Sequence, residues 1–291
     1  MKSALVLGGT QFFGKHLVQD LLEKGVNVTI ATRGTTPDPF GNQVERLRLN
    51  RESRETIAQA AEAGKWDVLY DQTCYSPQEA QDVMELFSGK IKRYIFTSTM
   101  AVYDFAPARK ETDFDPYSFG YTLKTRKEYP GLLGYQEAKR AAEAVLFQQA
   151  PFDVVAVRFP LVVGPDDYTN RFTFHTDRIK QGLPIGIDQP DERYSFISSA
   201  DAGRFLSWIG DTKQTGPFNA GCEADISMAE LIKRMEASLG KKATIITNAD
   251  PTDRSPYALP ASLSIDTTKA RAAGFTFETL DSLLGRLLQT K

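Results

Sequence analysis

Short apolar runs alternate with longer segments of helical periodicity up to about Pro160. The apolar runs predict strands at residues 3–9, 27–34, 44–50, 66–73, 93–99 and 152–159. The segments between them predict helices at residues 14–25, 51–64, 76–89 and 135–149. Alternation of this kind is typical of a parallel sheet with right-handed crossovers and helices on both faces. The pattern therefore predicts an α/β fold built on a doubly wound parallel sheet.

The pattern changes after Pro160, where proline, glycine and aromatic residues become frequent and the alternation stops. Helical periodicity returns at residues 197–210, 227–240 and 279–291, and we expect the first of these helices to pack back on the sheet. The expected sheet domain is residues 1–159 with 196–212 returning to it, and the expected smaller C-terminal lobe is residues 160–195 and 213–291.

Composition and charge exclude several classes of protein. The 291 residues carry a net charge of -2, which gives no electrostatic reason to expect a nucleic acid or a membrane as partner. No apolar stretch approaches the roughly 18 residues that span a bilayer, and Met1 leads into a strand pattern without signal-peptide regions. Cys74, Cys222, His16 and His175 are too few for a disulfide framework or a zinc centre. We expect a cytoplasmic protein without a metal ion.

The sequence LVLGGTQFFGKHL, residues 5–17, places a glycine turn between the first strand and the first helix. Glycine can adopt backbone angles that other residues avoid, and it allows close packing of a helix on a strand. The N–H groups at the start of such a helix bind phosphate. The turn therefore predicts a dinucleotide-binding, Rossmann-type sheet with a substrate-binding C-terminal lobe, and an ordinary strand–helix turn is the alternative. The predicted contact residues are Gly8, Thr10, Gln11, Phe12, Phe13 and Gly14.

Gln11 stands where a third glycine is usual in such a turn. Glycine is required only where φ is positive or where a Cβ atom would strike the phosphate. We hypothesise that the Gln11 side chain points outward and covers or contacts the bound nucleotide.

The end of the second predicted strand bears on which dinucleotide is bound. An acidic residue there would accept hydrogen bonds from the adenosine ribose, but the sequence offers Thr32 and Arg33. Arginine presents a planar fork of donors that suits phosphate, so we predict NADP as the cofactor, with NAD as the second choice. A solvated surface arginine is the alternative. Asn50, after the third strand, is placed to hydrogen-bond the adenine.

The sequence YQEAK places Tyr135 and Lys139 one helical turn apart. A nearby ammonium group favours the phenolate, so we expect the pKa of Tyr135 to fall. Such a tyrosine can exchange a proton with a substrate hydroxyl while a hydride moves to or from a nicotinamide, and a surface pair is the alternative. A hydroxyl from Thr97, Ser98 or Thr99 is expected to assist, and strand alternation puts Thr97 and Thr99 on one face.

These residues resemble the short-chain dehydrogenase/reductase superfamily, in its extended branch, the NAD-dependent epimerase/dehydratase family. The resemblance covers residues 1 to about 210 and rests on GGTQFFG, FTSTMAVY, YQEAK, RFPLVVGPDD and RYSFISSADAG. It implies that Thr99, Tyr135 and Lys139 are catalytic. It also implies cofactor contacts from Thr73, Cys74, Tyr75, Tyr135, Lys139, Phe159, Pro160 and Val162, and substrate contacts from Tyr103 and Arg193.

Gln11, Arg33 and the sequence GPDDYTNRF are more similar to an atypical sub-branch of this family, which includes plant chloroplast stem-loop RNA-binding proteins. Residues 104–134 form a longer segment than is usual in the family, and we expect either an active-site cover or a surface insertion. The resemblance also implies a homodimer. Its seam would be Ala138, Ala141, Ala142 and Leu146, which could equally pack on the sheet.

The leading hypothesis is an NAD(P)-dependent enzyme that moves a hydride between a nicotinamide and the carbinol or carbonyl carbon of a small molecule. Sugar-like compounds and nucleotide sugars are candidate substrates, and the net reaction can be oxidation, reduction, epimerisation or dehydration. The alternative is a regulatory or RNA-associated protein that binds the nucleotide without turnover. The Thr99, Tyr135 and Lys139 set favours the enzyme.

Overall fold

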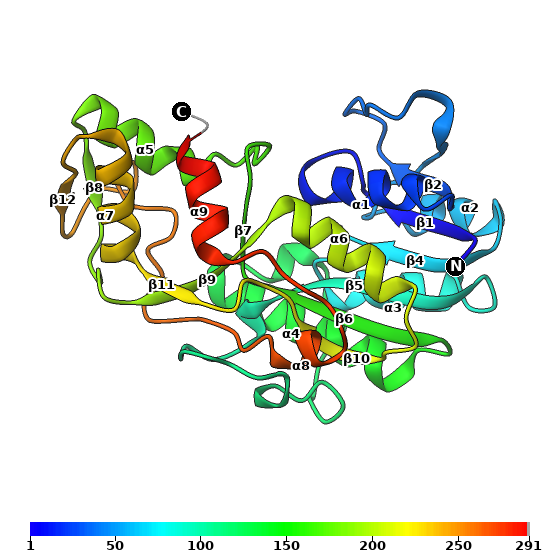
Figure 1. The fold of residues 1–291 in the computed structure, drawn as a ribbon. Helices are drawn as coiled ribbons and strands as arrows, with labels where there is room; N and C mark the ends of the chain where they lie inside the picture. Colours follow the sequence, from blue (N-terminus) through cyan, green and yellow to red (C-terminus); the bar gives the residue numbers. More distant parts are fainter. Residues whose placement is uncertain (290–291) are drawn as a thin grey trace.

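Seven parallel strands form the large sheet at the centre of the computed structural model, which describes residues 1–289 (Figure 1). The strand order is β10-β6-β5-β4-β1-β2-β3, so the chain changes direction across the sheet between β1 and β4. A sheet of this kind opens a crevice for ligands at its carboxyl edge near that point. The strands are β1 (Ser3–Leu7), β2 (Asn27–Thr32), β3 (Glu45–Arg48), β4 (Trp66–Asp71), β5 (Ile91–Thr99), β6 (Asp153–Phe159) and β10 (Gly216–Asn219).

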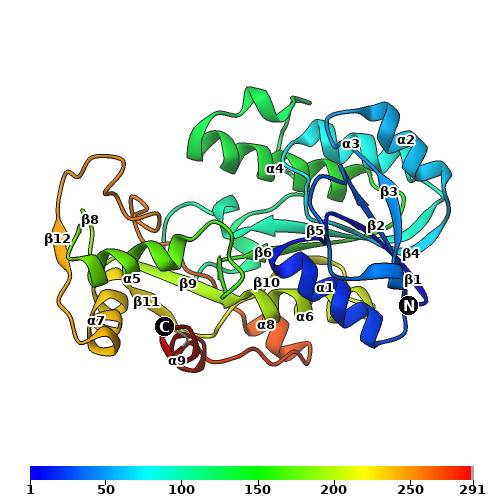
Figure 2. The same ribbon diagram turned by 90° about the horizontal axis from the view of Figure 1, so that it is seen from above.

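Helices cover both faces of this sheet, as the alternation predicted (Figure 2). One face carries α2 (Arg54–Glu62), α3 (Pro77–Leu86) and α4 (Gly131–Gln149), and the other carries α1 (Phe12–Glu23) and α6 (Ser199–Gly210). Each face has its own apolar core, with Ala80 and Ala142 in one and Leu17 and Phe205 in the other. The predicted doubly wound fold is therefore confirmed.

A second group of strands and helices lies beyond the carboxyl edge of the sheet, around a separate apolar core. Its sheets, as far as residues 1–289 show, contain three and two strands. The strands are β7 (Leu161–Val163), β9 (Arg193–Ser198) and β11 (Asp225–Ser227) in one sheet, and β8 (Pro184–Gly186) and β12 (Thr244–Ile246) in the other. The helices are α5 (Arg171–Gln181), α7 (Met228–Leu239) and α9 (Leu280–Gln289). No helix within the described residues is long and apolar enough to cross a bilayer.

The assignment of residues 213–291 to the smaller lobe is wrong in part. Strand β10 pairs with β6 at the edge of the large sheet, and α8 (Thr268–Ala272) packs beside β10. Phe275 packs in the same core as α1 and α6. Strand β10 was missed because GPFN is a short strand with proline and glycine. The final helix is observed to Gln289, and residues 290–291 of its predicted range lie outside the described residues.

A fully buried ion pair joins β6 to α4. The Arg158 guanidinium donates from Nε and Nη2 to the Glu143 carboxylate at 3.0 and 2.6 Å. Its other N–H groups donate to the Tyr103 hydroxyl, the Glu111 carbonyl and the Phe114 carbonyl. All five donors of this arginine therefore have partners, which is the condition for burying a charge without a large penalty.

The same arginine anchors the long segment 104–134, which wraps around α4. The Gln148 side chain donates to the carbonyls of Pro116 and Phe119, near the end of that helix. Four residues of the segment line the cavities described below. Arg126 lines the first, and Phe105, Leu132 and Leu133 line the second. Most of the segment therefore packs against α4, and a few of its side chains contribute to the cavity walls.

The predicted dimer seam is buried inside the chain. Ala138, Ala141, Ala142 and Leu146 on α4 are each at most 1% exposed, and Ala142 and Leu146 pack in the core shared with α3. These residues therefore pack on the sheet and its neighbours, which was the alternative to a dimer seam. These four residues are not available to a second subunit.

Arg158→Met tests the structural role of the buried ion pair. The variant leaves the Glu143 carboxylate buried without its partner, so we expect the free energy of unfolding to fall by about 3–5 kcal/mol in urea titrations. Arg234→Met is the matched control, because Arg234 pairs with Asp281 at the surface and its loss should cost less than about 1 kcal/mol. Equal losses in the two variants would contradict this role.

His175 lies fully buried in the core of the smaller lobe. Its Nε2 atom is 2.7 Å from the Ser255 hydroxyl, its Nδ1 atom is 2.9 Å from the Arg171 carbonyl oxygen, and its ring stacks on Tyr257. Burial lowers the pKa of His175 to about 4. In the unfolded chain the same imidazole takes up a proton below about pH 6.5.

This difference predicts a loss of stability in acid. Between about pH 6.5 and 4 the unfolded state binds a proton that the folded state excludes, so the free energy of unfolding falls by about 3 kcal/mol across this window and is unaffected above it. His175→Gln should remove this part of the pH dependence, as measured by urea unfolding at several pH values. An identical pH dependence in the variant and the wild type would refute the assignment.

Candidate functional site

The turn between β1 and α1 has the backbone that the glycine pattern predicted. Gly8 and Gly9 have φ angles of +110° and +90°, which other residues rarely adopt. A Cβ atom at Gly14 would lie 3.1 Å from the Gly9 Cα atom and would also strike the Gln72 side chain. Glycine at position 14 therefore allows the first turn of α1 to approach the strand end closely.

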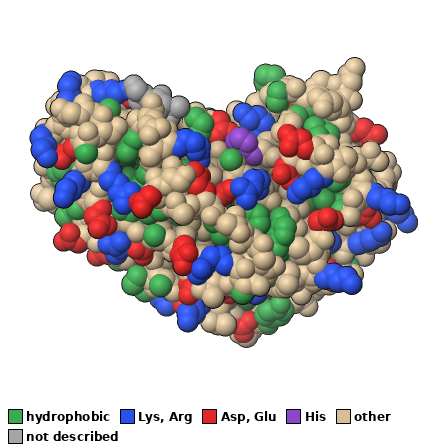
Figure 3. Space-filling model, viewed as in Figure 1, with side chains coloured by type: hydrophobic (Ala, Val, Ile, Leu, Met, Phe, Trp, Pro, Cys, Tyr) green, Lys and Arg blue, Asp and Glu red, His purple; other side chains and the backbone are tan. Residues whose placement is uncertain are grey.

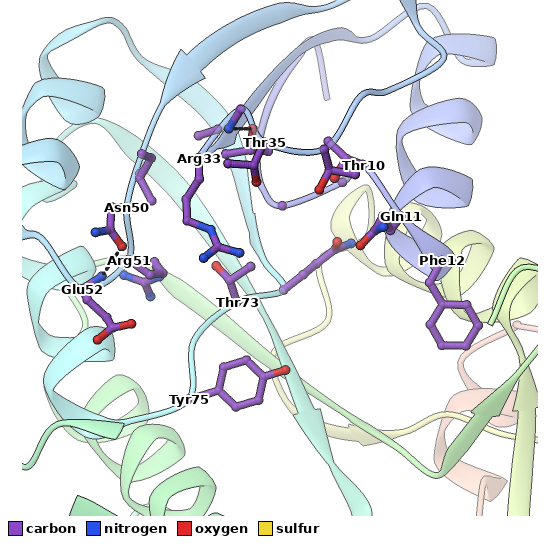
Figure 4. Close-up of a pocket in the computed structure, with 18 of the residues that line it drawn as sticks. Thr10, Gln11, Phe12, Arg33, Thr35, Asn50, Arg51, Glu52, Thr73 and Tyr75 are labelled. Carbon is purple, nitrogen blue, oxygen red and sulfur yellow. Dashed lines mark hydrogen bonds between the residues drawn. The ribbon is translucent and has the colours of Figure 1, made fainter. Parts of the chain in front are cut away.

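Gln11 does not disturb this turn. Its φ and ψ angles of -138° and 159° are extended backbone that any residue adopts, and its side chain is exposed at the start of α1. The amide lies at the rim of the adjoining cavity (Figure 4). The structure thus agrees with a Gln11 side chain that points away from the turn, and its contact with a nucleotide stays a prediction.

A first cavity of about 390 Å³ lies over this turn, at the carboxyl ends of β1, β2, β3 and β4 (Figure 4). The carboxyl ends of parallel strands meet at one edge of a sheet, which explains why residues so far apart in sequence converge there. The predicted cofactor residues that line this cavity are Gly8, Thr10, Gln11, Phe12, Phe13, Arg33, Asn50, Thr73 and Tyr75.

The charges in the first cavity are mostly positive. Arg51 is buried and pairs with Asp71 at 2.5 Å, and Arg126 pairs with Glu79 at 2.5 Å. Arg33 extends from the end of β2 into the cavity (Figure 4), and its guanidinium has no hydrogen-bond or ion-pair partner among residues 1–289. Arg33 is therefore the lining arginine best able to pair with an anionic ligand.

A second cavity of about 520 Å³ adjoins the first. Within the described part of the chain, the residues that line both are Phe12, Phe13, Gln72, Tyr75 and Tyr168. The second cavity contains all three predicted catalytic residues, Thr99 at the end of β5 and Tyr135 and Lys139 on α4. The predicted residues Tyr103, Phe159, Pro160 and Val162 also line it.

Tyr135 and Thr99 form a side-chain hydrogen bond in the second cavity. Burial raises the pKa of Tyr135 above its ordinary value, and the Thr99 hydrogen bond and the positive charge of Arg171 act in the opposite direction. The expectation that Lys139 lowers the pKa of Tyr135 is therefore wrong for the protein without a ligand. Ser98, the competing hydroxyl, is buried and donates to Glu143 instead.

Lys139 is held in a fixed position beneath the second cavity. Its ammonium group is buried and donates to the carbonyl oxygens of Cys74 and Thr97 at 2.7 and 2.9 Å. It also lies 4.8 Å from the ring centroid of Tyr75 and 5.9 Å from that of Tyr135. An ammonium group has three donors, so one N–H remains for a ligand.

Three predicted site residues do not line either cavity. Gly14 lies beneath the turn, and Cys74 is buried with its thiol pKa raised to about 12, so its contribution is the carbonyl that holds Lys139. Arg193, at the start of β9, pairs with Asp225 of the neighbouring strand β11 at 2.8 Å and with Glu230 at 3.1 Å. The predicted substrate role of Arg193 has no support from this placement.

Tyr103 is a fourth residue whose placement differs from the expectation. It borders the second cavity, but its hydroxyl is buried, accepts from Arg158 and donates to the Asn219 side chain at 2.7 Å. Burial raises the pKa of this phenol. Tyr103 therefore helps to hold β6 and β10 together, and its hydroxyl is occupied.

Sequence reasoning missed several residues that line the cavities. Gln72 directly follows β4 and Arg51 comes three residues after the end of β3, so the rule that ligands bind at the carboxyl edge could have found them. Arg171 and Leu263 come from the smaller lobe and have no local sequence signal. Among residues 1–289 there is no group of three or more His, Cys, Asp and Glu residues that could hold a metal ion.

A family model for the NAD dependent epimerase/dehydratase family matches residues 4–221, so the chain belongs to this family. The match includes the glycine turn, Thr99, Tyr135 and Lys139. The expected family is thereby confirmed.

The chain is also similar to two curated proteins. The chain is 24% identical over 269 residues to the chloroplast stem-loop binding protein of 41 kDa b of Arabidopsis thaliana, an alignment of 86% of this chain and 66% of that protein. It is 24% identical over 257 residues to the uncharacterized protein y4nG of Sinorhizobium fredii, covering 80% of this chain and 59% of that one. The chain thus spans less than two thirds of the length of these relatives.

The fold is also similar to that of the Thermus thermophilus UDP-glucose 4-epimerase, solved in complex with NAD. The TM-score is 0.75 at 18% identity, and the superposition covers 99% of this chain and 98% of that one. At this identity the likeness supports the fold alone.

Proposed function

We propose that the protein is an NAD(P)-dependent enzyme that transfers a hydride between a nicotinamide and the carbinol or carbonyl carbon of a small molecule. The observation that carries the proposal is the pair of adjoining cavities, with a glycine turn in one and Tyr135, Thr99 and Lys139 in the other. A dinucleotide has two halves joined by a pyrophosphate, which suits two cavities that meet at the turn.

The residues present fit such a cofactor. The positive φ angles at Gly8 and Gly9 turn the chain so that the N-terminus of α1 borders the first cavity, where its N–H groups can bind the pyrophosphate. The remaining N–H of Lys139 would donate to a ribose hydroxyl in the second cavity. When bound, the nicotinamide supplies the hydride acceptor or donor.

Tyr135 is the group that moves the proton in this mechanism. Its phenol donates a proton to the substrate oxygen in reduction, and its phenolate accepts the proton of the substrate hydroxyl in oxidation. The hydrogen bond to Thr99 and the charge of Arg171 both favour the phenolate and so oppose the effect of burial on the pKa. Thr99 orients the same substrate oxygen through its hydroxyl.

NADP is the proposed cofactor, because Arg33 lines the first cavity and its guanidinium has no partner in the described part of the chain, residues 1–289. The adenosine 2′-phosphate would give this guanidinium a bidentate anionic partner. The second arginine at this end, Arg51, already pairs with Asp71 and contributes positive potential from beneath. With NAD, Arg33 would stay solvated and contribute little to binding.

Tyr135→Phe tests the proposed chemistry. We expect turnover with NADPH to fall at least about 100-fold, because the phenolic proton is lost, while NADPH binding changes less than about twofold. NADPH oxidation and nicotinamide fluorescence measure the two quantities. Tyr117→Phe is the matched control, since Tyr117 is exposed and packs on Phe147 away from both cavities. Full activity in Tyr135→Phe would remove this residue from the mechanism.

Arg33→Glu tests the choice of dinucleotide. The loss of a charge-assisted hydrogen bond and the added repulsion should weaken NADP binding about 10- to 100-fold, and NAD binding less than about threefold. Calorimetric titration of both cofactors gives the two ratios, with the exposed Lys92→Glu, on the far end of β5, as the control for charge reversal. Equal weakening for NADP and NAD would show that Arg33 does not contact a 2′-phosphate.

A further inference from the structure

The outer wall of the second cavity, beyond Tyr135, is apolar. Side chains from the short helix η2 (Met100–Val102), segment 104–134, the start of α4, β7 and the chain before α8 meet there. These apolar lining residues are Met100, Phe105, Leu132, Leu133, Leu161, Pro256, Leu259 and Leu263. Met100 and Leu263 belong to one apolar cluster, with Phe105, Leu161 and Leu259 packed against it. A ligand group at this wall gains free energy mainly by burying apolar surface.

Positive charge in the second cavity is sparse. Of the residues that line it within the described chain, only Lys139 and Arg171 are cationic, and Lys139 already donates to two carbonyl oxygens. Arg171 donates from Nε to the Thr169 hydroxyl and from Nη2 to the Val162 carbonyl, and its Nε atom also lies 3.8 Å from the Asp167 carboxylate. Among residues 1–289, its Nη1 group has no partner and stays available to a ligand carboxylate. Its side chain is 30% exposed and lines the second cavity together with Tyr135.

A sugar nucleotide does not suit this cavity. Its diphosphate needs several donors or cations, because burying a charge without partners is costly. One lining arginine remains for it, since Arg193 pairs with Asp225 and Glu230 outside the cavity. The lining residues that come from residues 256–263 are Pro256, Leu259 and Leu263, whose side chains are apolar and offer a phosphate no hydrogen-bond donor.

We propose that the substrate is a small alcohol or ketone with an apolar body and a single carboxylate, and that a nucleotide sugar is not accepted. The apolar body packs on the wall that includes Leu259 and Leu263, and the carboxylate pairs with Arg171. This inference rests on the proposed function, because Tyr135 must face the reacting carbon.

Three compounds test the proposal by calorimetry on the wild-type protein saturated with NADP⁺. They are 4-phenyl-2-oxobutanoate, its neutral counterpart 4-phenylbutan-2-one, and UDP-glucose. We expect the oxo acid to bind at least about tenfold more tightly than the neutral ketone, because one charge-assisted hydrogen bond is added. UDP-glucose should bind more weakly than both. In the parallel NADPH assay, the carbonyl carbon gains a hydride and its oxygen gains the Tyr135 proton, which gives the alcohol and NADP⁺.

Variants on α5 distinguish an effect of the Arg171 charge on ligand binding from a general effect on the fold. Arg171→Gln should weaken binding of the oxo acid about tenfold or more and change binding of the neutral ketone less than about twofold. Arg171→Lys keeps the charge and should retain most of the affinity for the oxo acid. Lys180→Gln, the matched control, removes an exposed charge from the same helix outside the cavity and should change neither. NADPH fluorescence checks that each variant still binds cofactor.

Tighter binding of UDP-glucose than of both phenyl compounds would overturn the proposal, as would equal losses for both phenyl compounds in Arg171→Gln. Absence of binding by every compound to the NADP⁺-loaded protein would overturn it too. These results concern the substrate and do not contradict the proposed function. The proposed function is contradicted by a different result, which is that the wild-type protein binds neither NADP(H) nor NAD(H).

Discussion

One buried ammonium group determines where the candidate catalytic residues lie. Lys139 donates to the carbonyl oxygens that follow β4 and end β5, and these bonds fix α4 against the carboxyl edge of the sheet. One helical turn earlier, Tyr135 is thereby held beside Thr99. A lysine with so little exposure is stable only when its donors have partners, so the two carbonyls and the surrounding aromatic rings are required together. The hydrogen bonds of Lys139 to the two carbonyls therefore help to keep Thr99, Tyr135 and Lys139 at one cavity.

The two cavities differ in the physical basis of binding. The first is polar and lined by arginines, and the second has an apolar wall and is lined by Arg171 together with Tyr135. On the face shown in Figure 3, basic and acidic side chains are interspersed over the surface. The net charge of the chain therefore does not single out a binding surface, whereas the first cavity, at the carboxyl edge of the sheet, gathers Arg33, Arg51 and Arg126.

Much of this arrangement could be predicted from the sequence, because its causes are local. Apolar periodicity predicted the sheet and its helices, and the spacing of Gly8 and Gly14 predicted a turn whose angles are now observed. Long-range packing explains the predictions that were wrong. Arg193 has the right sequence context, but β11 brings Asp225 to it. Burial by residues remote in sequence raises the pKa of Tyr135, whereas a lower pKa was expected. Strand β10 forms by pairing with the edge of β6, which its own short sequence does not predict.

A crystal structure of the wild-type protein soaked with NADP⁺ tests the central claim most directly, that the two cavities hold one dinucleotide. The account predicts density for the pyrophosphate over residues 8–14, the 2′-phosphate within hydrogen-bond distance of Arg33, and the nicotinamide beside Tyr135 and Phe159. Density for the nicotinamide away from Tyr135, or an empty first cavity at saturating NADP⁺, would contradict it.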